Sequence, residues 1–525
     1  MKKLLALSLV LCIFLTACTT VDNPEPSATI PLLPELEEIT EGVQEQEPTV
    51  EDDTSFGLSY LPQYGMNPYT CTATVNRALF SLMYEPLFVV THDFTPAPVL
   101  CDSLESSSNG TFYRFRLLKD ARFSDGTALT GEDVRASLLA AKKSSMYSER
   151  LEHISSIYVA EDGAVEISLN TAYENLALML DVPIVKASTV EADFPLGTGA
   201  YFFRGQNLIR NPHWWKESHG VLSCDRIAMS PATEANDLRN QFEFGSTDLV
   251  YCDPNSTAAV GYRCDYEVWE SPTTILHYLG FNLYSGWFIE EEFRSAVTYA
   301  IDRDLFVNEI YGGFAQGTPL PCSPSSPFHD DQLAEEYDYA PAKFNEALRN
   351  SGILTDPEYE GHEGKFLVCL DDPARVKLAD RICKVFTDAG LRITVSALER
   401  KQYEQALRDQ NFDVYLGEVR LTANFDLSEF FMKYGNLQYG SISNTGLVTL
   451  CTEALANSGS YSELHRQIME WAPICPVAFK SYAIYVSRGK ITNNEPGVDF
   501  VFHDGLQARS LSDAYAEYRE EQPAQ

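Results

Sequence analysis

Two oppositely charged residues, Glu418 and Arg420, are the most informative candidates for binding chemistry in this sequence. They stand two positions apart, so an extended chain places both side chains on the same side. They either pair with each other or offer opposite charges to a zwitterionic ligand, since the forked donors of arginine suit a carboxylate. An ion pair at a surface or between lobes would contribute little by itself, and the sequence leaves these alternatives open.

Asn424 and Asp426 belong to the same polar stretch, which follows a strand predicted over residues 412–416. In open α/β sheets ligands bind beyond the strand ends, so both side chains are candidate ligand contacts. Asp426 has an alternative role as the cap of a helix predicted over residues 427–432, and we favour the cap.

Aromatic and amide side chains in predicted loops extend the candidate site. The chain has 28 tyrosines and 29 phenylalanines, and aromatic walls suit a site that grips peptides through backbone groups. For each such residue taken singly, packing in a core or loop is the simpler explanation. The candidates for ligand contact in predicted loops are Tyr64, Asn67, Trp287 and Tyr434.

Motifs for catalysis, cofactors and metals are missing from the sequence. It contains no GxSxG, HExxH, P-loop or CxxC motif. The fragment Gly197-Thr198-Gly199 precedes a predicted strand rather than a helix, which argues against a dinucleotide site. None of the nine histidines forms a close pair at ligand spacing. We therefore predict a binding protein without catalytic residues, cofactor or metal ligands.

An alternation of helices and strands is predicted for residues 320–480, which is typical of an α/β lobe. Predicted helices cover residues 341–351, 374–389 and 401–410, and predicted strands cover residues 365–370, 392–397 and 412–416.

The stretch before this lobe predicts a buried strand over residues 278–283 and two helices. The first helix carries apolar side chains from Phe293 to Ile301, and the second, over residues 305–311, is capped by Asp302. Further upstream, alternating strands at residues 112–117 and 165–169 and a helix capped by Thr130 favour a small domain inserted into its neighbour.

The N-terminus predicts export and lipidation. Lys2 and Lys3 precede an apolar run, residues 4–15, which is too short to span a bilayer as a mature helix. Leu15-Thr16-Ala17-Cys18 resembles a bacterial lipobox, and a plain secretory signal is the alternative. We expect residues 1–18 to be a signal segment and Cys18 to carry lipid chains that hold the protein at the outer face of the cell membrane.

The distribution of charge restricts the possible partners, and the cysteine spacing restricts the possible disulfides. Residues 19–53 contain eleven acidic and no basic side chains, which favours a disordered tether. The formal net charge of −36 argues against nucleic acid as a partner because repulsion would oppose binding. Ten cysteines follow Cys18 at spacings that predict no disulfide framework, and Cys252 and Cys264, the pair closest in sequence, are the candidate bridge.

Several motifs together resemble family 5 solute-binding proteins, the oligopeptide-, dipeptide- and nickel-binding components of ABC importers. They occur in the order typical of that family over most of residues 60–320. The matching segments are Tyr84-Glu85-Pro86-Leu87, residues 123–134 (FSDGTALTGEDV), 196–201 (LGTGAY) and 210–215 (RNPHWW), Phe281-Asn282-Leu283, and residues 294–303 (RSAVTYAIDR) with Gly312-Gly313.

The resemblance implies an α/β, two-lobed periplasmic-binding-protein-like fold of type II, in the large cluster with a small inserted domain. We expect lobe I to comprise residues 54–90, 195–282 and 481–525, the inserted domain residues 91–194, and lobe II residues 283–480. A ligand would be held between the lobes and delivered to ABC permease subunits in the membrane by a monomeric protein.

The chain departs from peptide-binding members of that family, which carry a Trp and, shortly after, an Asp that pairs with the peptide amino terminus. Here the Trp position falls on Glu418 or Arg420 and the Asp position on Leu421 or Ala423, which argues against dipeptide-type capture of the amine. Oligopeptides are our first choice of ligand, an anionic or zwitterionic small solute is the second, and nickel is the third.

Two functions from other classes compete with transport. A sensory receptor would bind the same ligand and signal to a membrane partner. An exported hydrolase on the same fold is the other rival, and the missing nucleophile–base motif argues against it.

Overall fold

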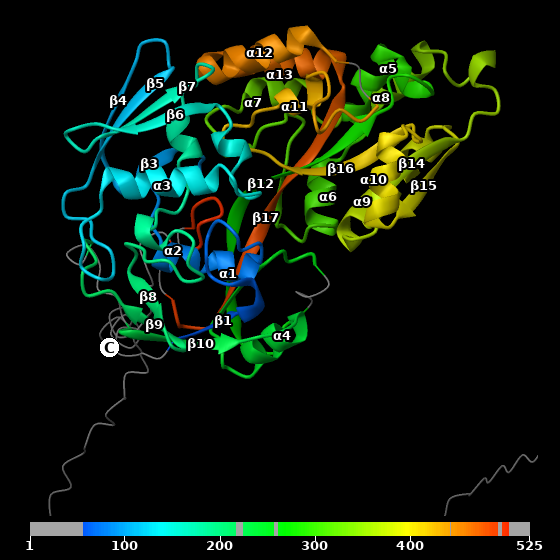
Figure 1. Ribbon diagram of the computed structural model, residues 1–525. Helices are drawn as coiled ribbons and strands as arrows, with labels where there is room; N and C mark the ends of the chain where they lie inside the picture. The colour runs from blue at the N-terminus through cyan, green and yellow to red at the C-terminus, as the bar shows by residue number, and fades with distance from the viewer. Residues whose placement is uncertain (1–55, 217–223, 257–260, 441–442, 492–495, 503–525) are drawn as a thin grey trace, which may run out of the picture. The chain divides into compact units, whose positions relative to one another are not determined.

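The computed structural model describes residues 56–216, 224–256, 261–440, 443–491 and 496–502. These described residues all belong to one compact unit, whose helices and strands are labelled in Figure 1. The predicted signal segment with Cys18 and the predicted tether lie outside the described residues.

Two long antiparallel strands, β12 (Tyr266–Phe281) and β17 (Ile474–Ser487), run side by side through the largest sheet (Figure 1). Their pairing is irregular between Pro272 and Leu276 and again between His277 and Tyr278. The other strands of this sheet are β1 (Phe56–Tyr60), β8 (Tyr201–Arg204), β9 (Asn207–Arg210), β10 (Arg226–Pro231), β11 (Leu249–Cys252), β13 (Ala315–Gly317), β14 (Gly364–Cys369), β15 (Ile393–Leu398) and β16 (Val414–Arg420).

The two long strands join two groups of shorter strands. The order across the sheet is β15-β14-β16-β12-β17-β11-β1-β10-β9-β8, with β13 paired to β17. We call β14, β15 and β16 the β14 half of the sheet, and β1 with β8 to β11 the β1 half. Because β12 pairs with β16 and β17 pairs with β11, each half is attached through one of the long strands.

Close packing between β12 and β16 requires glycine at two positions. Tyr278 lies opposite Gly417, and Gly280 lies opposite Tyr415. A Cβ atom at Gly417 would lie 2.4 Å from the Tyr278 ring, and one at Gly280 would lie 2.2 Å from the Tyr415 ring. Both rings are buried, so each tyrosine covers the glycine opposite it.

The β14 half is an α/β structure, as the sequence predicts. Its strands are parallel, and α9 (Pro373–Asp388) and α10 (Arg400–Arg408) connect them. Leu279 and Phe281 of β12 share a hydrophobic core with apolar side chains of α5 (Glu291–Ala296), α8 (Pro341–Asn350) and α9. One boundary was wrong: β16 continues to Arg420, although the predicted strand ends at residue 416.

A separate antiparallel sheet lies within residues 91–194, in the order β4-β5-β7-β6. Two of its strands have the predicted bounds, and α3 (Gly131–Ala141) begins with the predicted Thr130 cap, completed by Asp133. Whether this block is an independent domain stays a prediction. The strands outside the large sheet are β2 (Phe88–Val90), β3 (Pro96–Pro98), β4 (Cys101–Ser106), β5 (Phe112–Leu117), β6 (Ile154–Val159) and β7 (Val165–Leu169).

The remaining helices follow local signals with small differences. Oδ1 of Asp302 accepts a hydrogen bond from the Leu305 amide at 3.0 Å, which confirms the predicted cap of α6. The helix predicted from Phe293 to Ile301 is divided into α5 and a 3₁₀ turn, Val297–Ala300. These helices are α1 (Thr74–Ala78), α2 (Phe80–Met83), α4 (Ala235–Glu243), α6 (Arg303–Glu309), α7 (Asp331–Glu336), α11 (Ser428–Phe431), α12 (Thr445–Ala456) and α13 (Tyr461–Trp471).

The candidate disulfide between Cys252 and Cys264 was wrong. All ten cysteines from Cys71 to Cys475 are free thiols. Cys252 and Cys264 are half-buried and pack as small apolar side chains around Phe242. Within the ranges that the structure describes, no helix combines the length and apolar character that crossing a bilayer requires.

Asn282, just after β12, is predicted to stabilise the fold through its amide. Nδ2 donates to the carbonyls of Gln410 at 3.1 Å and Phe412 at 2.9 Å, and Oδ1 accepts from the Tyr284 amide at 2.9 Å. Because Asn282→Ala leaves the buried Phe412 carbonyl and two partly buried backbone groups without these partners, we expect the free energy of unfolding to fall by about 2–3 kcal/mol in urea denaturation. Asn345→Ala, on the exposed face of α8, is the control and should change it by less than about 1 kcal/mol. Equal stability of the two variants would contradict this role.

Candidate ligand-binding site

Glu418 lies in a charged network that joins β16 to β12 and β17. Its Oε2 atom is 2.8 Å from Nε2 of His277, the residue opposite on β12, and 3.7 Å from Nζ of Lys480 on β17. Nδ1 of His277 is 2.6 Å from the hydroxyl oxygen of Tyr311. Burial lowers the pKa of His277, so the ring is neutral at physiological pH, and it then donates from Nε2 and accepts from the tyrosine.

Lys480 is a buried cation held by carboxylates from three elements. Its side chain is 3% exposed, and Nζ lies 2.5 Å from Oδ2 of Asp253, which follows β11, and 3.3 Å from Oδ2 of Asp372, which caps α9. Burial opposes the lysine charge, but Asp253, Asp372 and Glu418 raise its pKa above the usual value. Burial likewise opposes ionisation of Glu418, but the hydrogen bond from His277 and the nearby cations hold its pKa well below the usual range. Both groups are therefore charged at neutral pH.

Arg375, in the first turn of α9, adds a second buried cation to this network. Its Nε atom lies 3.7 Å from Oδ2 of Asp372 and 4.0 Å from Oε2 of Glu418. The donor and acceptor atoms of His277, Asp372 and Glu418 lie within 4.8 Å of one another, a spacing that could hold a metal ion. Because Lys480 and Arg375 place positive charge beside the same oxygens, this group is unsuited to a metal cation.

Arg420 belongs to a second network on the same strand. Its Nη1 atom donates to both carboxylate oxygens of Asp499, at 2.8 and 2.6 Å. Asp499 also lies 3.7 Å from Nη2 of Arg150, which forms a hydrogen-bonded ion pair with Asp181. Burial opposes ionisation of Asp499, but Arg420 and two further arginines lower its pKa. Arg420 is thus already neutralised by a protein carboxylate.

The sequence left open whether Glu418 and Arg420 pair with each other or offer opposite charges to a ligand. The structure rules out the pairing. Both residues lie within β16, and each contacts partners distant in the sequence. Their role in ligand binding stays a prediction.

The loop after β16 is packed rather than open. Oδ1 of Asp426 accepts hydrogen bonds from the amide of Ser428 at 2.9 Å and from its hydroxyl at 2.6 Å. The N-cap of α11 is Leu427, which makes no side-chain cap bond, so the predicted cap at Asp426 was wrong by one residue. Asn424 is buried, and its carbonyl accepts from the Tyr461 hydroxyl. Phe425 has a φ of 55° and packs between Phe94 and Phe479.

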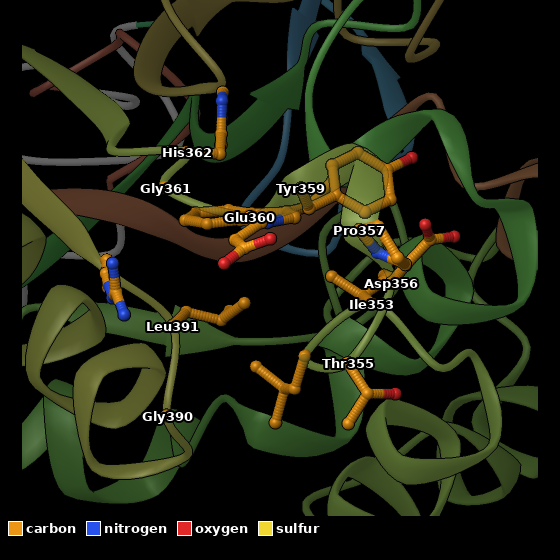
Figure 2. Close-up of a pocket in the computed structure, with 13 residues that line it drawn as sticks. Ile353, Thr355, Asp356, Pro357, Tyr359, Glu360, Gly361, His362, Gly390 and Leu391 are labelled. Carbon is orange, nitrogen blue, oxygen red and sulfur yellow. The ribbon is translucent and has the colours of Figure 1, made fainter.

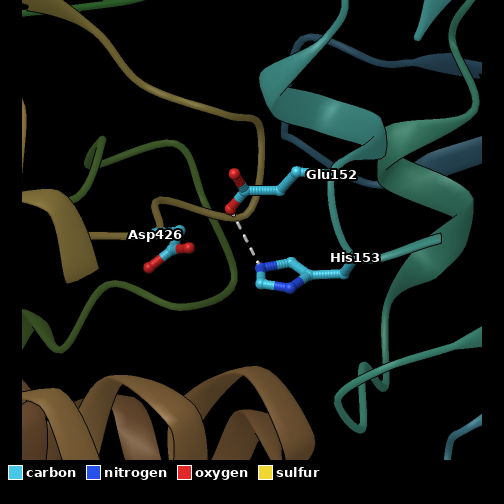
Figure 3. A group of neighbouring side chains, drawn as sticks. All are labelled: Glu152, His153 and Asp426. Carbon is cyan, nitrogen blue, oxygen red and sulfur yellow. Dashed lines mark ion pairs between the residues drawn. The ribbon is translucent and has the colours of Figure 1, made fainter. Parts of the chain in front are cut away.

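Asp426 also faces a histidine and a glutamate from the region before β6. Figure 3 shows Asp426 opposite Glu152 and His153, whose side chains form an ion pair with Oε1 and Nε2 at 3.2 Å. Ligand atoms of the three residues lie within 4.8 Å of one another, so this group could hold a metal ion. Burial and the nearby carboxylates raise the pKa of Glu152. The sequence predicted no metal site because the loops that meet here are far apart in the chain.

The loop candidates have different environments. Trp287 was predicted to be exposed, but it is buried against His362, with ring centroids 4.6 Å apart. It lines a pocket of about 380 Å³ formed by residues 353–362 and 390–392, shown in Figure 2, which includes neither Glu418 nor Arg420. The Asn67 amide is occupied, since Nδ2 donates to the carbonyls of Val190 and Ala192, both at 2.8 Å.

The two other loop candidates are accessible to solvent. Tyr64 is 48% exposed and Tyr434 is 85% exposed. The ligand contacts predicted for Tyr64, Asn67, Trp287 and Tyr434 stay predictions.

Comparison with known proteins places this arrangement in a family. The family model described as "Bacterial extracellular solute-binding proteins, family 5 Middle" matches residues 95–440, more than half of the chain. The chain belongs to this family. Members of family 5 are noncatalytic solute-binding proteins, which agrees with the absence of catalytic motifs in the sequence.

Among curated relatives, this family 5 protein is similar to the glutathione-binding protein GsiB of Pectobacterium atrosepticum, with 27% identity over 310 residues. That match covers 55% of this chain and 59% of the relative, so the chain spans less than two thirds of the length of the curated relatives it matches.

Two solved structures show the fold. The substrate-binding protein CtaP of Listeria monocytogenes superposes with a TM-score of 0.72 at 16% identity, covering 88% of this chain and all of the other. The oligopeptide-binding protein AppA of Bacillus subtilis, in complex with a nonapeptide, superposes with a TM-score of 0.59 at 18% identity, covering 85% and 97%. These superpositions confirm the predicted mixed α/β periplasmic-binding-protein fold.

Most of the charged partners in the two networks were missed from the sequence. Lys480 and Asp253 are 227 residues apart, and Arg420 and Asp499 are 79 residues apart, so no local spacing connects them. The one available signal was a charged or titratable residue inside an apolar strand, which describes both His277 and Lys480.

Removing the buried lysine tests the first network. Lys480→Met leaves three carboxylates without their shared cation, so we expect the free energy of unfolding to fall by about 3–5 kcal/mol at pH 7. The matched control is Lys384→Met, which breaks an exposed pair with Asp388 on α9 and should cost less than about 1 kcal/mol. Thermal or urea unfolding measures both, and a loss of equal size in the two variants would show that the network has no special role.

Proposed function

We propose that this protein is the extracytoplasmic solute-binding component of an ABC importer. It captures a peptide or peptide-like solute between two lobes and delivers it unaltered to a membrane permease. The match to family 5 over residues 95–440 carries this proposal. The relatives support the ligand class, since GsiB is named for glutathione binding and AppA of Bacillus subtilis was solved with a nonapeptide.

We infer that capture works by closure of lobe I (residues 54–90, 195–282 and 481–525) onto lobe II (residues 283–480). The irregular pairing of β12 and β17 around residues 272–278 supports a hinge there, because interrupted ladders resist bending less than regular ones. Residues 91–194 then form the inserted domain.

The charged networks on β16 support a ligand with charged groups. A zwitterionic or anionic small solute is therefore the second candidate. It is favoured by the positive charge of Arg77, Arg150 and Arg420 beside the carboxylates of Asp181 and Asp499. A receptor that signals to a membrane partner would use the same binding event, and the genes beside this one distinguish the two roles.

We also propose that the protein acts as a monomer anchored to the outer face of the cell membrane through lipid on Cys18. The lipobox-like residues 15–18 and the acidic segment of residues 19–53 support this arrangement. The tether would keep the binding lobes near the permease while leaving them free to meet solutes.

Native mass spectrometry of the full-length chain, purified without denaturant, tests the proposed function. We expect a complex heavier than the chain by the mass of a peptide or peptide-like solute, which is lost on denaturation. Titration of the released solute into emptied protein should produce calorimetric heat with one-to-one stoichiometry. A chain that carries no solute and shows no heat with a broad peptide and metabolite set would refute capture.

The lipid anchor has a separate test with a matched control. Cys18→Ser should move the protein from the membrane fraction to the soluble extracytoplasmic fraction, because no lipid can be attached. Cys12→Ser changes a cysteine inside the predicted signal segment and should leave the mature protein in the membrane fraction. Membrane retention of the Cys18→Ser protein would contradict anchoring at this residue.

A further inference from the structure

Glu152, His153 and Asp426 form a compact group where two distant parts of the chain meet, and we call them the Asp426 group. Glu152 and His153 lie just before β6, within residues 91–194, and Asp426 lies in the loop after β16 (Figure 3). One ligand atom from each side chain lies within 4.8 Å of the other two. Imidazole and carboxylate groups gathered in this way are common protein ligands of a divalent metal ion.

The ring nitrogen of His153 that lies nearest Glu152 has no hydrogen bond. Nε2 is 3.2 Å from Oε1 of Glu152, yet it is buried without a hydrogen-bond partner in the described structure. The oxygen therefore lies beside the direction of the ring N–H rather than along it. Because buried polar atoms of folded proteins are almost always paired, this nitrogen indicates a missing partner.

The separation of these two atoms agrees with a metal ion bound to both. Bonds from zinc to nitrogen and oxygen are about 2.0–2.2 Å long, so two ligand atoms at the tetrahedral angle lie about 3.4 Å apart. The observed separation of 3.2 Å is close to that value. An ion can reach the nitrogen from solvent, because the neighbouring Glu152 side chain is 53% exposed and can move aside.

Asp426 has one carboxylate oxygen available for an ion. Oδ1 accepts hydrogen bonds from the amide and the hydroxyl of Ser428, whereas Oδ2 accepts none from the residues that the structure describes. The bonds to Oδ1 hold the carboxylate in position, as the outer partners of metal-binding carboxylates commonly do.

The charge around the Asp426 group favours a cation. Burial raises the pKa of Glu152, and the carboxylates of Asp426, Glu429 and Glu149 raise it further, opposed by His153. Among the described residues, no lysine or arginine forms an ion pair with Glu152 or Asp426. A divalent ion would relieve the repulsion between these carboxylates.

The other group with suitable spacing already has its positive charge. Asp372 and Glu418, beside His277, lie within 4.0 Å of charged nitrogens of Lys480 and Arg375. The two groups therefore differ in their counter-charge, and only the Asp426 group is left with an excess of carboxylates.

We propose that the Asp426 group is a zinc site at which one ion joins residues 91–194 to the loop after β16. Nε2 of His153 and one oxygen each from Glu152 and Asp426 supply three ligands, and water completes the tetrahedral arrangement that zinc prefers. Nickel favours tetragonal arrangements, and calcium takes six to eight oxygen ligands, so both fit less well. The ion is part of the folded protein rather than the captured solute, so the assignment does not depend on the proposed function.

Zinc would strengthen a contact that other side chains already make. Phe94, within residues 91–194, packs against Phe425, the neighbour of Asp426, with ring centroids 5.1 Å apart. Further along the same block, Oε2 of Glu174 accepts hydrogen bonds from the amide and the hydroxyl of Ser458, both at 2.6 Å. Without the ion, carboxylates from the two regions face each other unneutralised, so zinc should stabilise the folded protein.

Isothermal titration of zinc chloride into the full-length chain tests the site. The chain is first treated with EDTA and then dialysed into metal-free buffer at neutral pH. We expect one ion per chain at the highest affinity, and a melting temperature that rises with zinc but not with the same concentration of calcium. Glu152→Gln, His153→Gln and Asp426→Asn should each weaken this binding at least about tenfold and abolish the rise.

A matched variant separates coordination from general attraction. Glu149→Gln removes the same charge from an exposed carboxylate that acts on Glu152 but does not belong to the group. It should change zinc affinity by less than about threefold. Because the Glu152 side chain is exposed, Glu152→Gln keeps the test valid even if circular dichroism shows that one of the other two variants is unfolded.

Other results overturn the assignment. Zinc that fails to bind, or binds the three ligand variants as tightly as the parent, would show that the Asp426 group is an ion pair only. Equal losses in Glu149→Gln and Glu152→Gln would show attraction by negative charge without coordination. Equal stabilisation by calcium would contradict the histidine ligand. Each of these results leaves solute capture standing, since native mass spectrometry tests it separately.

Discussion

The hydrogen-bonded pairing of β12 with β17 is the constraint on which the rest of the structure depends. Strands of the β14 half attach to β12 and those of the β1 half attach to β17, so within the sheet the two halves are joined through this pair. Around residues 272–278, where the backbone pairing of β12 with β17 is irregular, side-chain contacts supply part of the connection between the two halves. Lys480 on β17 reaches Asp253 beside the β1 half and Asp372 at the start of α9, and it thereby links both halves by charge.

Such buried charges fix the relative positions of the elements that carry them more than they stabilise the folded state. Taking Lys480, Asp253, Asp372 and Glu418 out of water costs much of what their attraction returns. A lost partner, however, leaves an uncompensated charge in the interior, so the network tolerates only a narrow range of positions for the elements that supply it. The neutral ring of His277, between Glu418 and Tyr311, adds directional hydrogen bonds to the same region. The proposed closure of one lobe onto the other requires defined positions in this region.

The sequence predicted the elements that local chemistry decides and missed those decided by distant contacts. The helix caps at Thr130 and Asp302 could be predicted from the sequence, because each cap is next to its helix in the chain. The end of β16 could not be predicted, because Gly417 and the charged residues Glu418 and Arg420 interrupt the apolar pattern, and their pairing with β12 keeps them in the strand. From the sequence alone, Trp287 was predicted to be an exposed loop residue, but in the structure its ring packs against His362. Glu418 and Arg420 were expected in an extended segment after a strand, whereas both lie within β16. Asp499 and Lys480, which neutralise them, follow them by many residues and carry no local motif.

Family membership and fold indicate a protein that binds solutes without chemical change, and the proposed mechanism adds closure about the long strands. Small-angle X-ray scattering of the full-length chain, emptied and then saturated with the solute recovered from it, measures that closure most directly. A hinge at β12 and β17 predicts a smaller radius of gyration and a shorter maximum dimension in the bound state. Scattering curves that superimpose with and without saturating solute would contradict the mechanism.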